Sequence, residues 1–171
     1  MGLVTTFSPE EDFKVIEIII FNNGAIYGGY LRDSIAGERE KIKDIDVVLS
    51  ELYRDKFHNE MTEEGYEVKF NASNFTFVYK KPGEKVVEAY FVQDDPADTV
   101  MGPESEPDYD VNLLAWNGES LYIWTDPNRQ IYRIISHIIE KKTVEISHNP
   151  EREEKILSKG YTIIGSDDSY L

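Results

Sequence analysis

Apolar residues repeat at helical spacing after the Ser8-Pro9-Glu10-Glu11 capping box and up to Asn22, which predicts a first helix. Its predicted buried stripe consists of Phe13, Ile16, Ile19 and Ile20. A short apolar run, 25–27, predicts a strand, and the Gly28-Gly29 pair after it predicts a turn into a second helix at 30–36. The chain therefore begins in the order helix, strand, turn, helix.

The middle of the chain changes to a two-residue period. The β-branched run 44–49 predicts a strand, and Ser50 then caps a third helix at 51–63 that ends before Gly65. Its predicted inward residues are Leu52, Phe57 and Met61. Three further strands are predicted at 66–70, 75–80 and 85–92. The turn Lys81-Pro82-Gly83-Glu84 predicts that the last two of these strands form a hairpin.

The C-terminal part combines a hairpin with two helices. The turn Asn117-Gly118-Glu119 separates predicted strands at 113–116 and 121–124. A helix then begins at the Asp126-Pro127 cap and ends near Lys142. Its predicted apolar face consists of Ile131, Ile134, Ile135 and Ile138. Pro150 opens a final helix, for which the predicted inward residues are Ile156 and Leu157.

The composition is that of a globular chain. With 171 residues and 40% apolar positions, we expect a single domain, 1–171, with a substantial core. There is no cysteine, which excludes disulfides and Cys-ligated zinc. The longest apolar run, 15–21, is interrupted by Glu17, and the N-terminus lacks the pattern of a signal peptide. We therefore expect a cytoplasmic protein with no membrane partner.

The charge narrows the set of partners. Thirty-three acidic and 18 basic residues give a formal net charge of −15. Proteins that hold nucleic acid through its phosphates need clustered Lys and Arg, and an acidic surface repels a polyanion at long range. The composition therefore argues against assigning RNA as the substrate on the basis of motifs alone. The segment 94–110 is rich in acids and prolines and is predicted to be a loop.

Two motifs suggest a site for a nucleoside triphosphate and Mg²⁺. Asp44 and Asp46 lie two residues apart in a predicted strand, so both face one side, about 7 Å apart at Cα, where they can converge on divalent cations. The Gly28-Gly29 pair between a strand and a helix allows close approach of a phosphate to the backbone. Taken singly, each motif has a simpler reading, as an ordinary turn or a solvated strand edge.

A third carboxylate lies in the predicted strand 85–92. Glu88 is the single acid among apolar neighbours there. A carboxylate in the middle of a buried strand is costly unless it is paired or binds a metal. Glu88 is therefore predicted to complete the site, and the alternative is an edge-strand residue facing water.

The order strand, Gly-Gly, helix and Asp-x-Asp strand resembles the nucleotidyltransferase superfamily, specifically the head domain of CCA-adding enzymes and bacterial-type poly(A) polymerases. That family carries Gly-Gly-x-Val-Arg-Asp, a later Gly and then Asp-x-Asp. The matching residues here are Gly28-Gly29-Tyr30-Leu31-Arg32-Asp33, Gly37, Asp44 and Asp46. The linker before Asp44 is about two residues longer than the family pattern leads us to expect.

The resemblance implies an α+β fold of the nucleotidyltransferase (polymerase beta-like) type, with a mixed β-sheet flanked by helices. It implies that two Mg²⁺ or Mn²⁺ ions are bound by Asp44, Asp46 and Glu88, the third acid of the family. Gly28, Gly29 and Arg32 would contact the nucleotide, whereas Asp33 is predicted to be structural. The core motifs span 24–115, and the C-terminal helices 127–160. We expect no counterpart of the family's neck, body and tail domains within residues 1–171.

The chain departs from the family at 106–115. The family segment Arg-Arg-Asp-Phe-Thr-Ile-Asn-Ala-Leu-Ala is matched here without either arginine, although Asp108 and Asn112 are kept. Those two residues remain nucleotide-binding candidates, with a structural role for Asn112 as the alternative. The missing positive charge could come from the C-terminal helices, although solvated helix faces are the simpler reading of their basic residues. These are Arg129, Arg133, Arg152 and Lys155.

The resulting hypothesis is a metal-dependent nucleotidyltransferase that moves an NMP from an NTP to a hydroxyl, with an RNA 3′ end as the family-typical acceptor. Three alternatives stay open. In the first, the acceptor is a small molecule or a protein side chain, which would suit the acidic surface better. In the second, the chain is a non-catalytic binding module. In the third, it is a head domain that works with a basic partner subunit.

Overall fold

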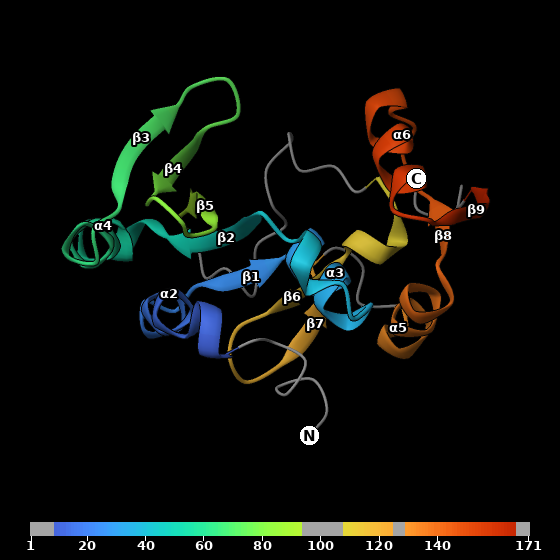
Figure 1. The fold of residues 1–171 in the computed structure, drawn as a ribbon, viewed down its shortest axis with the longest axis horizontal. Coiled ribbons are helices and arrows are strands. Elements are labelled where there is room, and N and C mark those ends of the chain that lie inside the picture. Colours follow the sequence, from blue (N-terminus) through green and yellow to red (C-terminus); the bar gives the residue numbers. More distant parts are fainter. Residues whose placement is uncertain (1–8, 94–107, 125–128, 167–171) are drawn as a thin grey trace.

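Helices and strands alternate along the chain in the computed structural model, which describes residues 9–93, 108–124 and 129–166 (Figure 1). The predicted Ser8 cap, most of the acidic segment 94–110 and the predicted Asp126-Pro127 cap lie outside these ranges. The helix predicted to start at that cap begins instead at Ile131, since residues 129–130 are not helical. Within them the fold is α+β, with a mixed sheet flanked by helices, as the sequence predicted. No helix in the described part of the chain is both long and apolar enough to cross a bilayer.

The elements follow the predicted order closely. The first half contains α2 (Pro9–Phe21), β1 (Ala25–Tyr27), α3 (Gly29–Ile35), η1 (Arg39–Lys41), β2 (Asp44–Ser50), η2 (Glu51–Tyr53), α4 (Arg54–Glu63), β3 (Glu67–Asn71), β4 (Thr76–Lys80) and β5 (Val86–Val92). The second half contains η4 (Asp110–Asn112), β6 (Leu114–Trp116), β7 (Leu121–Ile123), α5 (Ile131–Glu140), β8 (Lys142–Glu145), α6 (Pro150–Ser158) and β9 (Thr162–Ser166). The short parallel pair of β8 and β9 was not predicted.

The main sheet has the strand order β3-β4-β5-β2-β1-β6-β7. Strands β2 and β5 are parallel, and the other neighbours in this sheet are antiparallel. A parallel pair needs a long crossover, which α4, β3 and β4 provide. This crossover places β5 directly beside β2, and the antiparallel pairing of β4 with β5 confirms the predicted hairpin at Lys81–Glu84.

Side-chain alternation gives the two faces of the central strands different roles. Ile45, Val47 and Leu49 of β2 are buried in the main core together with Phe57 and Met61 of α4. The intervening residues of β2 and β5, which include all three predicted acids of the site, point to the opposite face. The helix side of the sheet therefore supplies the core, and the other side is free to form a site.

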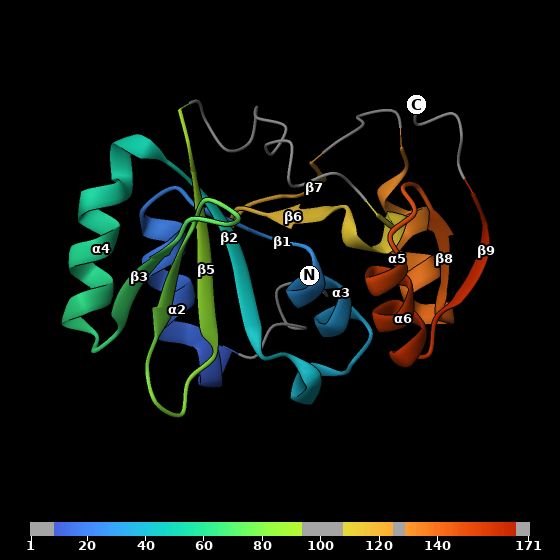
Figure 2. The ribbon, with the colours of Figure 1, turned by 90° about the horizontal axis from the view of Figure 1, so that it is seen from above.

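The C-terminal elements lie at the opposite end of the molecule from β3 and α4 (Figures 1 and 2). They are tied to η4 by the buried carboxylate of Asp110. Its Oδ1 accepts hydrogen bonds from Thr143 Oγ1 and from the backbone N–H of Val144, both at 2.9 Å, and its Oδ2 lies 2.6 Å from His137 Nδ1. One side chain thus joins η4 to α5 and β8.

Some predicted inward residues are wrong. Helix α2 buries Val15, Ile18 and Ile19, whereas Phe13 is 57% exposed, because this helix is apolar on most sides and the period alone does not select a face. Leu52 is 88% exposed because the helical phase begins only at Arg54, after the 3₁₀ turn η2. The remaining wrong prediction is Leu157, which is exposed next to the buried Ile156.

Candidate functional site

Strand pairing brings two of the predicted acids together. Asp46 and Glu88 are direct partners in the parallel β2–β5 ladder, so their side chains leave the same face of the sheet side by side. Tyr27 is the partner of Asp46 on the other side, in the antiparallel β1–β2 ladder. The three side chains form a row across three strands, and all three line one cavity.

The environment of this row disfavours negative charge. Burial, the neighbouring charge of Glu88 and a hydrogen bond between the two carboxyl groups raise the pKa of Asp46 to about 7. Burial and the charges of Asp46 and Glu88 also raise the pKa of the Tyr27 hydroxyl. The negative charge of the acid pair is therefore poorly compensated by the surrounding protein, which is the electrostatic condition that a bound cation relieves.

Asp44 is placed differently from the other two acids. It is the first residue of β2, shares the face of Asp46 by alternation, and adds to the rise in the Asp46 pKa. Its side chain is exposed, and it is not among the described residues that line the cavity. The structure thus brings Asp46 and Glu88 together in the cavity lining and leaves Asp44 out of it.

The acid pair suits the divalent cations that the family resemblance implies. Carboxylate oxygens are the ligands that Mg²⁺ and Mn²⁺ prefer. Asp46 and Glu88 are within hydrogen-bonding reach of each other, and a cation between them would remove the repulsion that raises the Asp46 pKa. The residues present therefore fit such an ion, with Asp44 as the nearest additional carboxylate along β2.

The Gly28-Gly29 turn lines the same cavity. Gly28 caps α3 with φ 72° and ψ −131°, a conformation that residues with a Cβ avoid. A Cβ on Gly29 would lie 3.3 Å from Arg32 Nη2. The first glycine is therefore needed for the backbone turn, and the second leaves room for the guanidinium.

A series of hydrogen bonds and ion pairs runs along the cavity wall from Arg32 to Arg152. Arg32 is buried, and its Nε donates to Asp33 Oδ1 at 2.9 Å, while its Nη1 donates to Asn112 Oδ1 at 2.6 Å. Asn112 Nδ2 donates to Asp108 Oδ1 at 3.0 Å. Asp108 Oδ2 then lies 3.5 Å from Arg152 Nη1 of α6. This series positions both predicted residues, Asp108 and Asn112, on the cavity surface.

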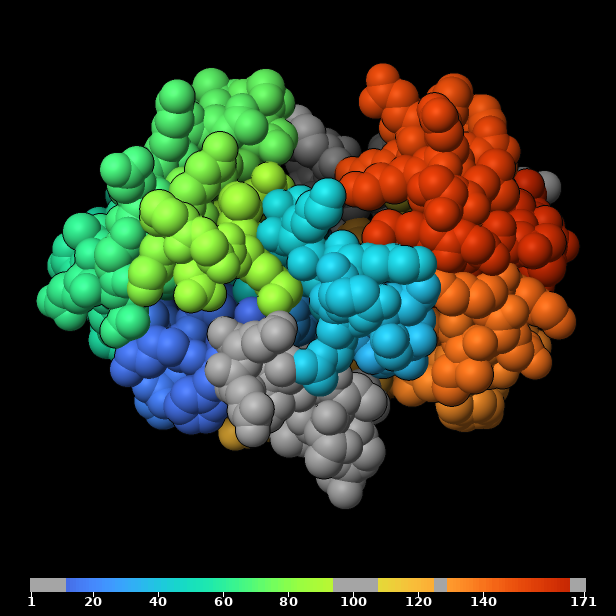
Figure 3. Space-filling model, in the orientation of Figure 1, coloured from blue at the N-terminus to red at the C-terminus, as the bar shows by residue number. Residues whose placement is uncertain are grey.

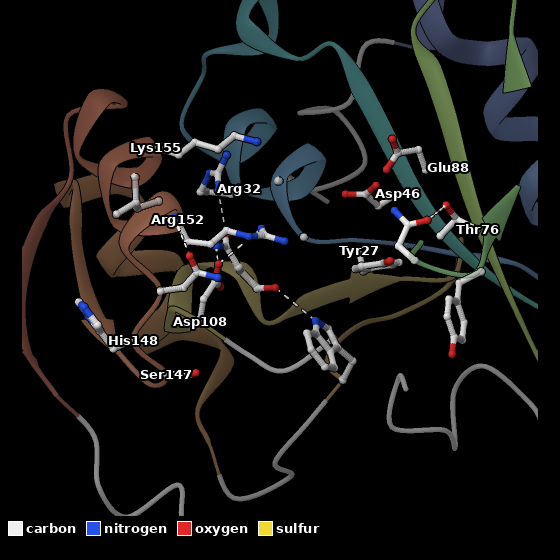
Figure 4. Close-up of a pocket in the computed structure, with 18 residues that line it drawn as sticks. Tyr27, Arg32, Asp46, Thr76, Glu88, Asp108, Ser147, His148, Arg152 and Lys155 are labelled. Carbon is white, nitrogen blue, oxygen red and sulfur yellow. Dashed lines mark hydrogen bonds and ion pairs between the residues drawn. The ribbon is translucent and has the colours of Figure 1, made fainter. Parts of the chain in front are cut away.

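The cavity has a volume of about 520 Å³ and two chemically different walls. The acids Asp46 and Glu88 lie on one side, and Arg32, Arg152 and Lys155 lie on the other (Figure 4). In the space-filling view a recess separates the strands β3–β5 from the C-terminal segment (Figure 3). An elongated ligand with anionic groups at one end and a cation-bound group at the other matches this distribution of charge.

Seven of the eight predicted site residues line this cavity, the exception being Asp44. The lining also includes residues that the sequence did not indicate: Asn74, Thr76, Tyr90, Trp124, Ser147, His148, Asn149 and Ile156. Thr76 could have been placed near the site from the predicted hairpin, because its register puts Thr76 and Val78 on the same face as Glu88. For Arg152 and Lys155 a solvated helix face was the preferred prediction; both residues are exposed to solvent, and both also line the cavity.

Comparison with solved structures finds similar folds in CCA-adding and tRNA-processing enzymes. The chain is similar to a CCA-adding enzyme in complex with ATP, with TM-score 0.63 and 16% identity over 94% of this chain and 41% of that one. It is similar to the Thermotoga maritima CCA-adding enzyme complexed with tRNA, with TM-score 0.66 and 15% identity over 98% and 42%. A tRNA-processing enzyme in apo form gives TM-score 0.62 and 18% identity over 96% and 46%.

No protein-family model matches the sequence, and a search of curated proteins found no match. This chain spans less than half the length of the structures that it resembles. At this level of identity the likeness establishes a shared fold: the chain has the α+β nucleotidyltransferase-type fold of the CCA-adding enzymes.

Proposed function

We propose that this protein is a metal-dependent nucleotidyltransferase, which transfers an NMP from an NTP to a hydroxyl acceptor. One observation carries the proposal: the cavity has an acid pair, Asp46 and Glu88, on one wall and the basic residues Arg32, Arg152 and Lys155 on the other. A metal-bound α-phosphate at the acids and phosphate oxygens at the cations would use both walls. The shared fold with CCA-adding enzymes supports the same reaction class.

The reaction forms a bond between the acceptor oxygen and the α-phosphorus and breaks the bond from that phosphorus to the bridging oxygen, so pyrophosphate leaves. Negative charge builds on the phosphoryl and leaving oxygens. Divalent cations held by carboxylates would supply charge stabilisation for both. In this proposal Asp46 and Glu88, with Asp44 at the start of the same strand as Asp46, hold the cations, and Glu88 takes the proton of the acceptor hydroxyl.

The opposite wall orients the nucleotide. Arg152 and Lys155 are three residues apart on α6, so they share a helix face and can contact the same phosphate group. The Gly28-Gly29 backbone allows the triphosphate to approach closely. Arg32 is already bound to Asp33 and Asn112, so its role is to fix the wall and to present its remaining N–H groups to the ligand.

The acceptor is the least constrained part of the proposal. An RNA 3′ end fits the complex of a similar enzyme with tRNA. The net charge of −15 favours an acceptor that is not a polyanion, such as a small molecule or a protein side chain, unless a basic partner subunit offsets the repulsion.

The test is Mg²⁺-dependent release of pyrophosphate from each of the four NTPs, with and without pooled small RNAs. We expect release by the wild type and a loss of at least about 100-fold in Asp46→Asn, since one residue of the acid pair is removed. Asp55→Asn, which makes the same change at a 93% exposed carboxylate on α4, is the matched control and should keep full activity.

Release that requires RNA would identify an RNA acceptor and name the base. Release without RNA would point to a different acceptor. An absence of release in all conditions, together with no binding of any NTP in the presence of Mg²⁺, would refute the proposed function.

A further inference from the structure

A second group of metal-ligating side chains lies where the end of β8 meets the first turn of α6. Glu145, His148 and Glu153 each place a ligand atom within 4.8 Å of the other two. His148 Nδ1 is 3.1 Å from Glu145 Oε2. Donor atoms that surround one cation at bond lengths of about 2.1 Å are separated by roughly 3–4 Å, so these side chains are already close to coordination geometry.

The secondary structure fixes the backbone around each of the three residues. Glu145 is the last residue of β8 and pairs with Ser166 of β9. Glu153 donates its backbone N–H to Asn149 O at 2.9 Å, in the first turn of α6. His148 immediately precedes Asn149, the residue that caps this helix. Closing the three side chains around an ion therefore requires changes in rotamer and no change in fold.

A buried hydroxyl next to the group lacks a partner. The Tyr109 side chain is fully buried, and its hydroxyl makes no hydrogen bond in the described structure. An isolated antiparallel bridge pairs Tyr109 with Glu145, so the two side chains leave the same face of that pair. Buried hydroxyls are normally hydrogen-bonded. Water or a carboxylate oxygen ordered by an ion at this site would supply the missing partner.

We propose that Glu145, His148 and Glu153 form a binding site for one divalent transition-metal ion, of the class of Zn²⁺ or Mn²⁺, separate from the Asp46–Glu88 pair. One imidazole and two carboxylates suit these ions better than Mg²⁺, which prefers oxygen ligands alone. His148 also lines the cavity, so the ion would add positive charge beside Arg152. The site does not depend on the proposed function.

The first test is calorimetric titration of Zn²⁺ into the full chain carrying Asp46→Asn and Glu88→Gln, which disables the other carboxylate pair. We expect one bound Zn²⁺ per chain, and an affinity at least about 100-fold lower when His148→Ala is added. Glu154→Gln, an exposed acid of the same helix outside the group, is the matched control and should leave the affinity unchanged. Equal affinities with and without His148→Ala would overturn the proposal.

The second test detects metal binding at His148 by NMR. The chain has three histidines, so their ring signals are readily separated by NMR. Substoichiometric Mn²⁺ should broaden the His148 signals before those of His58 and His137, and Glu153→Gln should abolish this order. Uniform broadening of all three rings would contradict the site. The His148 side chain is 60% exposed, so thermal unfolding of the metal-free His148→Ala variant should match the wild type.

Discussion

At the scale of single residues, the burial of Asp46 and the closeness of Glu88 govern how the metal-free site responds to pH. The pKa of Asp46 is raised from 3.8 to about 7 by burial and by Glu88. A carboxyl group with a higher pKa in the folded than in the unfolded state binds its proton more tightly when folded. The contribution of Asp46 to the free energy of unfolding should therefore be greatest in acid. It should fall as the pH rises from 3.8 to about 7, the two pKa values of this carboxyl group.

Asp46→Asn removes this titration. We expect the metal-free variant to exceed the wild type in free energy of unfolding at pH 8 by about 1 kcal/mol or more, and to lose that advantage near pH 4, where Asp46 is protonated. Urea unfolding in EDTA at both pH values measures the difference. Mg²⁺ should stabilise the wild type more at pH 8 than near pH 4. A difference between variant and wild type that is independent of pH would contradict the coupling.

Gly28→Ala tests the turn at the cavity. Gly28 has φ 72° and Gly37 has φ 75°, and a Cβ at either position would meet open space. We expect both alanine variants to lose about 1–2 kcal/mol of stability through backbone strain. Only Gly28→Ala should also weaken NTP binding, by about tenfold or more, because its backbone lines the cavity. Equal NTP affinity in the two variants, by calorimetry, would remove Gly28 from the site.

The acids of the site could be predicted from the sequence because strand alternation is a local rule. Asp46 and Glu88 each stand among apolar neighbours in a β-rich run, and a period of two assigns both to the face opposite the core. The parallel register that makes them partners is not local, since it depends on the crossover through α4, β3 and β4. The Asp44–Asp46 pair was predicted as a unit, whereas only Asp46 lines the cavity.

At the scale of elements, order and type were predictable and orientation was less so. Turn and cap residues punctuate the sequence, and they mark the hairpin at Lys81–Glu84 and the start of α6 after Asn149. In α2 the predicted Ile16, Ile19 and Ile20 pack in or against the core, but Phe13 was assigned wrongly because apolar residues surround most of that helix. The basic residues of α6 were assigned to solvent because nothing in the local pattern indicates the cavity that they line.

The Asp110 network is the link between η4 and the C-terminal elements. Asp110→Ala would leave Thr143 Oγ1 and the Val144 N–H without their buried acceptor and should lower the free energy of unfolding by about 3 kcal/mol. Thr143→Val removes one of the hydrogen bonds and should cost about 1 kcal/mol. Urea unfolding compares the two variants. A loss in Asp110→Ala no larger than in Thr143→Val would show that the network does not join these elements.

Helix α6 is expected to hold phosphate through its basic face. Arg152→Ala should raise the KM for the NTP by about tenfold, because a charge-assisted hydrogen bond to phosphate is lost. Arg133→Ala, an exposed arginine of α5 that does not line the cavity, is the matched control. Steady-state pyrophosphate release gives both values. A KM that responds equally to the two substitutions would assign Arg152 to the solvated surface.

At the scale of the whole molecule, the site depends on the two ends of the fold. The central strands supply the acids, α3 supplies Arg32, and α6 supplies Arg152 and Lys155. The Asp108 carboxylate links Arg152 of α6 to Asn112, which in turn accepts a hydrogen bond from Arg32. This long-range arrangement explains why the sequence indicated the acid pair and the glycine turn but not that α6 lines the same cavity. The single-domain organisation of residues 1–171 stays a prediction, and the chain spans less than half of the similar CCA-adding structures.

The central claim is that this cavity binds a triphosphate through a cation at Asp46 and Glu88. The most direct measurement is calorimetric binding of non-hydrolysable analogues of the four NTPs to the wild type and to Asp46→Asn, in Mg²⁺ and in EDTA. We predict binding of at least one analogue in Mg²⁺, weakened about tenfold or more by EDTA or by Asp46→Asn. Binding of equal strength in all four conditions, or no binding of any analogue, would contradict the claim.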